Sequence, residues 1–207
     1  MKKLLLSILL TFQACCSAYA IEGTQSASFF LQNLVDEVIT TLKSDPSITH
    51  DHLKMETYVT NNILSQFDMT YMSQAIVGEV AWNQSKLSDQ TKLINETNQF
   101  FMHIIAKTLA EYNGTQTIIF DQLPAMPDSE KVMLTGKLYD PTDETMAFSF
   151  KVIKVASEWK IYDVSLGGID LINTYKSNFK SIVASGGVAK LADELHKKNQ
   201  AVAAGKY

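Results

Sequence analysis

The chain has 207 residues and a net charge of −4, and all 18 of its basic residues are lysines. A mildly acidic chain is a poor candidate for binding nucleic acid or for standing attachment to an anionic membrane. Because arginine is absent, the planar group that holds phosphate in a bidentate manner is missing, which disfavours a tight, phosphate-specific site.

Residues 1–20 have the features of a secretory signal peptide. Two lysines precede an apolar run at 4–12, and Ala-Tyr-Ala at 18–20 forms a small-x-small cleavage site. The apolar run is too short to span a bilayer. Cys15 and Cys16 leave lipidation open, although the residues before each make a poor lipobox. We expect cleavage after Ala20, which leaves one domain at 21–207 with a net charge of −6 and no cysteine, so its core alone must stabilise it.

Helical periodicity dominates the next part of the chain. Asp45-Pro46 ends the first pattern, Gly78 ends the third, Ser88 is the expected cap of the fourth, and Asn113-Gly114 its stop. Four helices are therefore predicted, at 28–44, 51–65, 69–77 and 88–112.

After Gly114 the apolar period changes to two. The strands predicted from this period lie at 117–123, 131–139, 145–155 and 158–166, with loops at 124–128 and 140–143 and a tight turn near Ala156-Ser157. Short connections favour antiparallel neighbours. We expect an α+β fold with N-terminal helices, a four-stranded or slightly larger curved antiparallel sheet, and C-terminal helices packed on one face, which leaves room for a pocket between the layers.

The last predicted strand carries bulky groups on both sides. Strict alternation puts Trp159, Ile161 and Asp163 on one face and Lys160, Tyr162 and Val164 on the other. Gly167-Gly168 is expected to turn this strand into a helix rich in apolar and aromatic residues. Such an arrangement can wall a cavity as easily as fill a core.

Side chains that could carry chemistry have simpler structural interpretations. His50-Asp51-His52 is better explained as an exposed capping loop than as a metal site, because no third ligand is evident. His103 is expected to be a partly buried structural residue, His196 a solvated charge near the C-terminus, and Asp163 an acceptor of backbone hydrogen bonds. We find no nucleophile elbow, phosphate loop or zinc-protease motif, so no catalytic group and no metal site is predicted.

Several short motifs occur together in a recognisable order. A Trp-Lys-Ile-Tyr-Asp-Val strand at 159–164 is followed by Tyr-Lys-Ser-Asn-Phe at 175–179, Gly186 and a Leu-rich helix at 191–195. Upstream, Phe-Asp-Met-Thr-Tyr-Met-Ser begins at Phe67 and precedes Val-Gly and a tryptophan. This order resembles the MlaC or toluene-tolerance family over nearly all of the predicted mature chain. One departure is Lys176, where the family has arginine.

The resemblance implies a periplasmic phospholipid carrier and not an enzyme. It implies a deep apolar cavity between sheet and helices that holds acyl chains, with the headgroup near solvent, no cofactor, and only transient membrane contact. Expected partners are an inner-membrane ABC transporter complex with a lipid-binding ring and an outer-membrane lipoprotein–porin complex, in a system that maintains outer-membrane lipid asymmetry. The residues that we expect to line the cavity are Phe148, Phe150, Val152, Ile161, Val164, Ile169, Leu171, Tyr175 and Phe179.

Two other interpretations remain open at this point. One is a periplasmic adaptor with a filled core and no ligand. The other is a small enzyme that uses Asp163 or His103 in a pocket. Because one fold hosts many functions, the fold alone does not choose among them.

Overall fold

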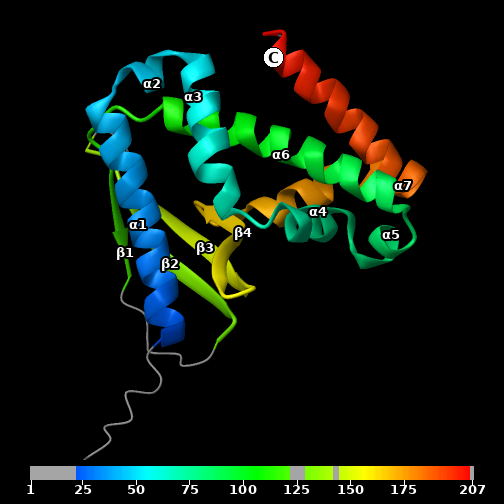
Figure 1. Ribbon diagram of the computed structural model, residues 1–207, viewed down its shortest axis with the longest axis horizontal. Coiled ribbons are helices and arrows are strands. Elements are labelled where there is room, and N and C mark those ends of the chain that lie inside the picture. The colour runs from blue at the N-terminus through cyan, green and yellow to red at the C-terminus, as the bar shows by residue number, and fades with distance from the viewer. Residues whose placement is uncertain (1–21, 122–128, 142–144, 206–207) are drawn as a thin grey trace, which may run out of the picture.

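The computed structural model describes residues 22–121, 129–141 and 145–205, with side chains from residue 27 onward. The predicted signal peptide with its two cysteines, Leu123, the loop 124–128 and residues 142–143 lie outside these ranges. The chain forms an α+β fold, as expected. Figure 1 shows α1 lying across the sheet, while α4 to α7 form a helical half beside it.

The first predicted helix is confirmed, and the second is correct in place but not in type. The elements observed here are α1 (Glu22–Ser44), α2 (Ser47–His50), α3 (His52–Tyr58), the π-helical turn η1 (Val59–Ile63) and the 3₁₀ turn η2 (Leu64–Gln66). Asp51 separates the two short helices and caps α3, its side chain accepting the Lys54 backbone N–H at 3.1 Å. The Asn62 side chain donates to the Tyr58 carbonyl at 2.9 Å, a local bond that competes with regular helix geometry.

The predicted third and fourth helices are present with changed ends. α4 (Met69–Val77) starts from Asp68, whose side chain accepts the Tyr71 N–H, and stops at Gly78 with φ of 84°. The chain then forms α5 (Glu79–Asn83), which the sequence did not indicate. α6 (Leu87–Ala110) follows Lys86, so the prediction that Ser88 caps it is wrong, and it ends before Asn113. Shifts of this size are usual, because the first and last turns of a helix are the least regular.

Five antiparallel strands form one sheet in sequential order. They are β1 (Thr117–Phe120), β2 (Lys131–Tyr139), β3 (Met146–Val155), β4 (Glu158–Leu166) and β5 (Ile169–Asp170). Ala156 and Ser157 both have positive φ, at 47° and 75°, which confirms the predicted tight turn between β3 and β4. Gly167-Gly168 makes a second hairpin into β5, not the predicted turn directly into a helix.

A β-bulge corrects the predicted faces of β4. Ile161 pairs with Val152 and Asp163 pairs with Lys151, and Val152 and Lys151 are successive residues of β3. Ile161 and Asp163 therefore point to opposite faces, while Val164, paired with Phe150, shares the face of Ile161. The extra residue reverses the alternation that the sequence implied. We call the face with Ile161 and Val164 the inner face, and the face with Lys151 and Asp163 the outer face.

The C-terminal segment is one long element with a break. α7 (Leu171–Ala203) starts at Asp170, whose side chain accepts the Asn173 N–H at 3.0 Å. Gly187 has φ of 64° and Gly186 is also non-helical, so α7 is effectively two helices, as the sequence predicted. The helices of the described ranges are all too short or too polar to cross a bilayer.

The core consists of three apolar clusters. The first joins α4, α5, α6 and α7, the second joins α1 to the inner face of the sheet, and the third joins α1, α3, η1 and α6. Phe67 packs against all three. It also forms an isolated bridge with Ile161, which places it beside β4 on the edge that does not pair with β3. The clusters therefore meet where the helical half joins the sheet.

Candidate functional site

The inner face of the sheet is covered unevenly. Val132, Val152 and Ile161 lie in one row across the strands and are at most 5% exposed, because Ala27 and Leu31 of α1 pack over them. Beyond this row, Leu134 and Phe148 are still buried, Phe150 and Val164 are partly buried, and Met146 and Leu166 are exposed. We use the name apolar sheet surface for the inner-face residues Met146, Phe148, Phe150, Val164 and Leu166.

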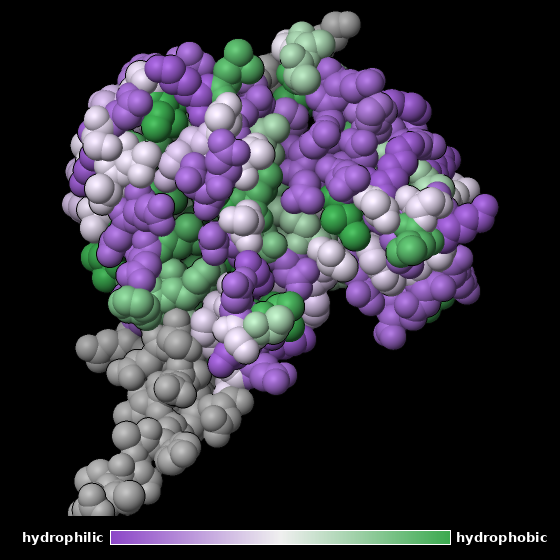
Figure 2. Space-filling view, in the orientation of Figure 1, coloured by the Kyte–Doolittle hydropathy of each residue, from purple (hydrophilic) through white to green (hydrophobic). Residues whose placement is uncertain are grey.

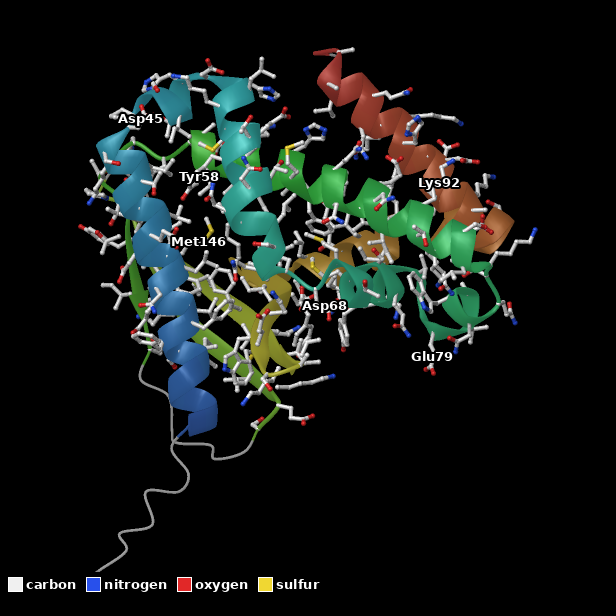
Figure 3. The ribbon with its side chains drawn as sticks, viewed as in Figure 1. Asp45, Tyr58, Asp68, Glu79, Lys92 and Met146 are labelled. Atoms are coloured by element: carbon white, nitrogen blue, oxygen red, sulfur yellow. The ribbon has the colours of Figure 1, made fainter. Side chains whose placement is uncertain are left out.

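This surface is accessible from one side of the molecule. Met146 is 38% exposed and Leu166 is 40% exposed. In the view of Figure 3, Met146 is seen between α1 and α3. Figure 2 shows apolar side chains at the surface in the middle of the same view, with hydrophilic residues on both flanks. Exposed apolar groups on a sheet of this kind are typical of a site for an apolar ligand or partner.

Seven of the nine residues predicted to line a cavity fall into two groups. Phe150, Val152, Ile161 and Val164 belong to or pack against the cluster between α1 and the sheet, whereas Leu171, Tyr175 and Phe179 belong to or pack against the helical cluster. Phe148, Val152, Ile161 and Phe179 are buried, Phe150, Val164, Leu171 and Tyr175 are partly buried, and Ile169 is 67% exposed. The strand register thus places six of the nine on the inner face, because Ile169 pairs with Leu166. That these residues line a cavity stays a prediction.

Aromatic rings give the apolar sheet surface its shape. Phe148 makes edge-to-face contacts with Phe120 at 5.4 Å and with Phe150 at 5.6 Å between ring centroids. Gly136 lies opposite Phe148, and a Cβ there would come within 2.5 Å of the Phe148 ring and 2.3 Å of the Ile119 carbonyl oxygen. The absence of a side chain at Gly136 therefore allows the Phe148 ring to lie across β2.

Sequence reasoning missed three residues of this region. Met146 and Leu166 continue the inner face to its exposed end, and Phe67 joins the three clusters. The alternation of β3 was a usable signal for Met146. The motif that begins at Phe67 marks this residue but not its contacts, which come from segments distant in the chain.

A concave region lies on the other side of β4, where α4 and α5 approach the start of α7. It is a polar pocket of about 390 Å³. None of the nine predicted residues lines it. Its walls are Tyr71, Gln74, Ala75, Gly78 and Glu79 from α4 and its exit, Lys151, Tyr162 and Asp163 from the sheet, and Asp170, Ile172, Asn173 and Lys176 from the start of α7.

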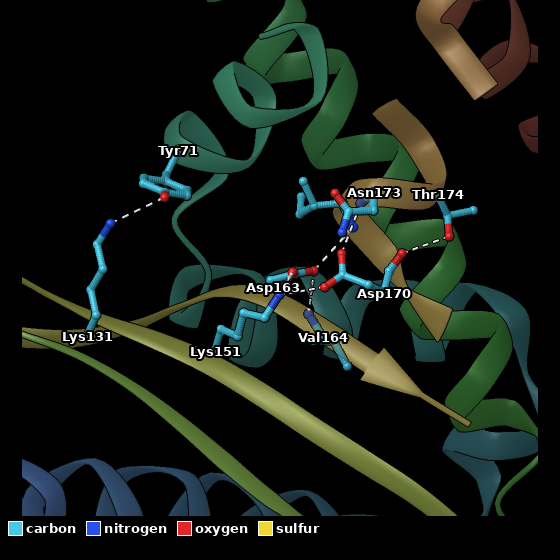
Figure 4. A network of polar contacts seen from close by, with 9 residues as sticks. Tyr71, Lys131, Lys151, Asp163, Val164, Asp170, Asn173 and Thr174 are labelled. Carbon is cyan, nitrogen blue, oxygen red and sulfur yellow. Dashed lines mark hydrogen bonds and ion pairs between the residues drawn. The ribbon is translucent and has the colours of Figure 1, made fainter. Parts of the chain in front are cut away.

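One wall of the polar pocket is an ionic network, shown in Figure 4. The Lys151 Nζ donates to the Asp163 carboxylate at 2.7 Å and to the Asp170 carboxylate at 2.5 Å. Asp163 is only 3% exposed and also accepts the backbone N–H groups of Val164 at 2.9 Å and Ile172 at 3.2 Å. The prediction that Asp163 accepts backbone hydrogen bonds is confirmed. Its role as the anchor of Lys151 was not foreseen.

Burial and pairing act in opposite directions on this network. Burial raises the pKa of Asp163, and the hydrogen bond from Lys151 only partly offsets it. Burial also acts on Asp170, but the bonds from Lys151 and from the Asn173 N–H outweigh it and lower the Asp170 pKa. Burial disfavours the charge of Lys151, yet its two carboxylate partners raise its pKa. All three groups are therefore held in one tightly coupled arrangement.

The histidines serve structural roles. His103 is partly buried, as predicted, and its Nδ1 lies 2.7 Å from the Glu56 carboxylate on α3. The Asp51 cap and the exposure of its two histidine neighbours fit the predicted capping loop. His196 is exposed, as predicted for a solvated charge, but its Nδ1 also lies 2.8 Å from the buried carboxylate of Glu96, which accepts from Asn199. Tertiary packing of α6 on α7, not sequence position, decides this pairing.

Metal ligation has no support in the described ranges. Nowhere among their residues do three His, Cys, Asp or Glu side chains gather in a way that could hold a metal ion. Two histidine–glutamate pairs, His103–Glu56 and His196–Glu96, link one helix to another, and a third, His52–Glu56, lies within α3.

Comparisons with known proteins bear on both the fold and the site. The family model described as MlaC protein matches residues 32–197. The structure of a phospholipid-binding protein from Ralstonia solanacearum, in complex with a phospholipid, is similar to this chain with a TM-score of 0.75 and 26% sequence identity. The similarity covers 84% of this chain and 96% of the other. A search of curated proteins gives no match.

Proposed function

Since the chain belongs to the MlaC family, we propose that it binds phospholipid through its acyl chains and carries it between the outer and inner membranes. The observation that supports this most directly is the partly exposed apolar sheet surface, in a fold similar to that of a phospholipid-binding protein. The acyl chains would lie over Phe150 and Val164 and continue toward Phe67, where the three apolar clusters meet.

The energetics of transfer explain why a protein with such a surface is useful. Two acyl chains contain on the order of 30 methylene groups, and exposing them to water costs roughly 20 kcal/mol at about 0.8 kcal/mol each. A protein that replaces one apolar surrounding by another avoids this cost. Transfer from bilayer to protein can then be nearly balanced in free energy.

The side chains of the site suit a ligand of variable length. Met146 is unbranched and adapts its shape, and the rings of Phe120, Phe148 and Phe150 present faces and edges that tolerate different chain positions. A site of this composition selects for apolar volume more than for headgroup. The absence of arginine agrees with that preference.

The cellular setting of the proposal follows from the family. The protein would act in the periplasm after removal of residues 1–20, make only transient membrane contact, and maintain the lipid asymmetry of the outer membrane. Its partners would be the inner-membrane ABC transporter complex with a lipid-binding ring and the outer-membrane lipoprotein–porin complex. No direction of transport is included in the proposal.

The hydrogen bonds of the two candidate catalytic residues favour binding over catalysis. The Asp163 carboxylate is occupied by Lys151 and two backbone N–H groups, and the His103 ring is engaged by Glu56. Both oxygens of the Asp163 carboxylate are therefore engaged, and His103 contacts Glu56 through its Nδ1. A ligand-free adaptor is the second candidate function, and it differs in requiring no lipid at all.

The experiment that tests the proposal is extraction of the purified mature protein with organic solvent and identification of the extract by mass spectrometry. We expect phospholipid from the unchanged protein and from Ser149→Asp, which adds a charge on the outer face. We expect loss of lipid from Phe150→Asp and Val164→Asp, because each puts a charge in the path of the acyl chains. Circular dichroism identifies which variants are folded.

Two results would count against the proposal. Lipid retained by a folded Phe150→Asp or Val164→Asp protein would exclude the apolar sheet surface as the site. Absence of lipid from the unchanged protein, together with no uptake from vesicles, would favour the adaptor. If an aspartate variant does not fold, Val164→Trp replaces it and tests the site by filling the space.

A further inference from the structure

The polar pocket is lined by two oppositely charged, exposed side chains that no other group of the described ranges neutralises. Glu79 at the start of α5 and Lys176 on the first turns of α7 both line it. Neither side chain has an ion-pair or hydrogen-bond partner within the described part of the chain, and they do not pair with each other. We propose that this pocket binds a small zwitterion, a ligand that carries an ammonium group together with a phosphate or carboxylate.

This site is separate from the proposed acyl-chain site, so the inference goes beyond the proposed function. Lys151 and Asp163, which form the pocket wall, point to the outer face of the sheet. Phe150 and Val164 point to the inner face. Strand β4 itself lies between the two regions, and a ligand can occupy one without entering the other.

The ammonium end of the ligand has a surface prepared for it. Tyr71 and Tyr162 both line the pocket, with ring centroids 4.8 Å apart in an edge-to-face arrangement. The protein's own Lys131 ammonium lies 5.0 Å from the Tyr71 centroid and 5.7 Å from the Tyr162 centroid. This contact has the geometry of a cation–π interaction, in which the partial negative charge of the ring faces favours an ammonium group. A ligand ammonium at these rings would take the place of that of Lys131. Glu79, which lines the pocket just beyond the end of α4, supplies a full negative charge.

The anionic end has Lys176 as its counter-charge. Lys151 does not serve this role, because its ammonium already contacts two carboxylates. The side-chain amides of Gln74 and Asn173 also line the pocket and have no other partner in the described ranges, so they can donate to phosphate or carboxylate oxygens.

Ligands with a single charge fit the pocket poorly. Lys151 and Lys176 stand against Glu79, Asp163 and Asp170, which leaves the walls close to neutral. A cation alone would leave Lys176 unneutralised, and an anion alone would face three carboxylates. A zwitterion satisfies both free charges at once, and the pocket volume of about 390 Å³ lies within the range typical of small-ligand sites.

The test is a titration of the mature protein followed by amide NMR, with O-phosphoethanolamine as the zwitterion and ethanolamine and ethyl phosphate as its halves. We expect saturable shifts at Tyr71, Tyr162 and Asn173 with O-phosphoethanolamine and up to about fivefold weaker binding of each half, as expected for one partly exposed ion pair. Glu79→Gln and Lys176→Gln should each weaken the binding of O-phosphoethanolamine by a similar factor. Lys180→Gln, an exposed lysine on the same helix, should leave its affinity unchanged.

The source of the zwitterion is decided by competition. Displacement of O-phosphoethanolamine by vesicles of phosphatidylethanolamine, but not of phosphatidylglycerol, identifies a lipid headgroup, and absence of displacement identifies a soluble zwitterion. The inference is overturned if no probe shifts these residues, or if either half binds as tightly as the whole. Solvent-extracted lipid should be unchanged in both charge variants, so this result stands apart from the test of the acyl-chain site.

Discussion

Replacing Lys151 by methionine is expected to destabilise the protein in a way that depends on pH. Methionine keeps the apolar stem of the side chain but removes the ammonium that bridges Asp163 at 2.7 Å and Asp170 at 2.5 Å. Two carboxylates are then left side by side, one of them 3% exposed. Removing one partner of a buried ion pair costs about 3–5 kcal/mol. Because backbone N–H groups still stabilise Asp163, we expect about 3 kcal/mol at pH 7, the lower end of that range.

The sign of the pH dependence follows from the carboxylates. Without Lys151, the folded-state pKa of the pair rises, because each charge then repels the other in a partly buried site. The folded variant binds a proton that the unfolded chain releases, so its stability is greatest at low pH and falls as pH rises through the folded-state pKa. In the unchanged protein, the raised pKa of Asp163 and the lowered pKa of Asp170 act in opposite directions and leave a smaller dependence.

The assay is urea unfolding followed by tryptophan fluorescence at pH 5 and pH 7.5. We expect Lys151→Met to lower the free energy of unfolding by less at pH 5 than at pH 7.5. The difference should be at least about 1.4 kcal/mol, the equivalent of one pKa unit. Lys137→Met is the matched control, because Lys137 is an exposed lysine on the outer face of β2. A cost below about 1 kcal/mol at pH 7.5, or an equal cost at both pH values, would refute the argument that Lys151 neutralises a buried carboxylate pair.

Three further predictions concern the packing of the protein. Gly136→Ala should lower the stability by about 2–3 kcal/mol in thermal unfolding and displace the Phe148 ring, because the alanine Cβ would lie 2.5 Å from that ring. An unchanged melting temperature would show that the strand adjusts freely. Asn199→Ala should lower the free energy of unfolding in urea by about 2 kcal/mol, since Asn199 donates to the buried Glu96 carboxylate at 2.9 Å and to the Glu96 backbone carbonyl at 3.0 Å. An unchanged free energy of unfolding would mean that solvent replaces these bonds. Burial raises the pKa of Tyr175, so the folded state holds this proton more tightly than the unfolded chain does. Stability should therefore be intact below about pH 10 and fall above it, and Tyr175→Phe should reduce that fall, a result to be checked by urea unfolding at about pH 8 and about pH 11.

Local pattern was a reliable guide where one segment decides its own structure. Gly78 ends α4 and the Ala156-Ser157 turn joins β3 to β4, because positive φ is needed at these positions and the local sequence marks them. The α+β order followed from the change of period near Gly114. The ends of α6 were placed less well, since several consecutive residues can start or end a helix at similar cost.

The prediction for β4 shows what a local sequence pattern cannot predict. Alternation assigned Asp163 to the face of Ile161, but the bulge against β3 reverses it. Whether a strand bulges depends on its partner strand, and no periodicity within β4 records that. The same limit explains why the pairing of His196 with Glu96, 100 residues away, was missed.

By itself, the sequence determined the class of fold, the order of helices and strands, and the membership of the family, because each of these depends on residues close together in the chain. The tertiary structure alone decided which side chains face one another: Lys151 between two aspartates, Glu79 across a pocket from Lys176, and Phe67 where three clusters meet. Contacts between distant segments are set by the register of strands and the packing of helices. These depend on the whole chain at once, so no window of the sequence contains them.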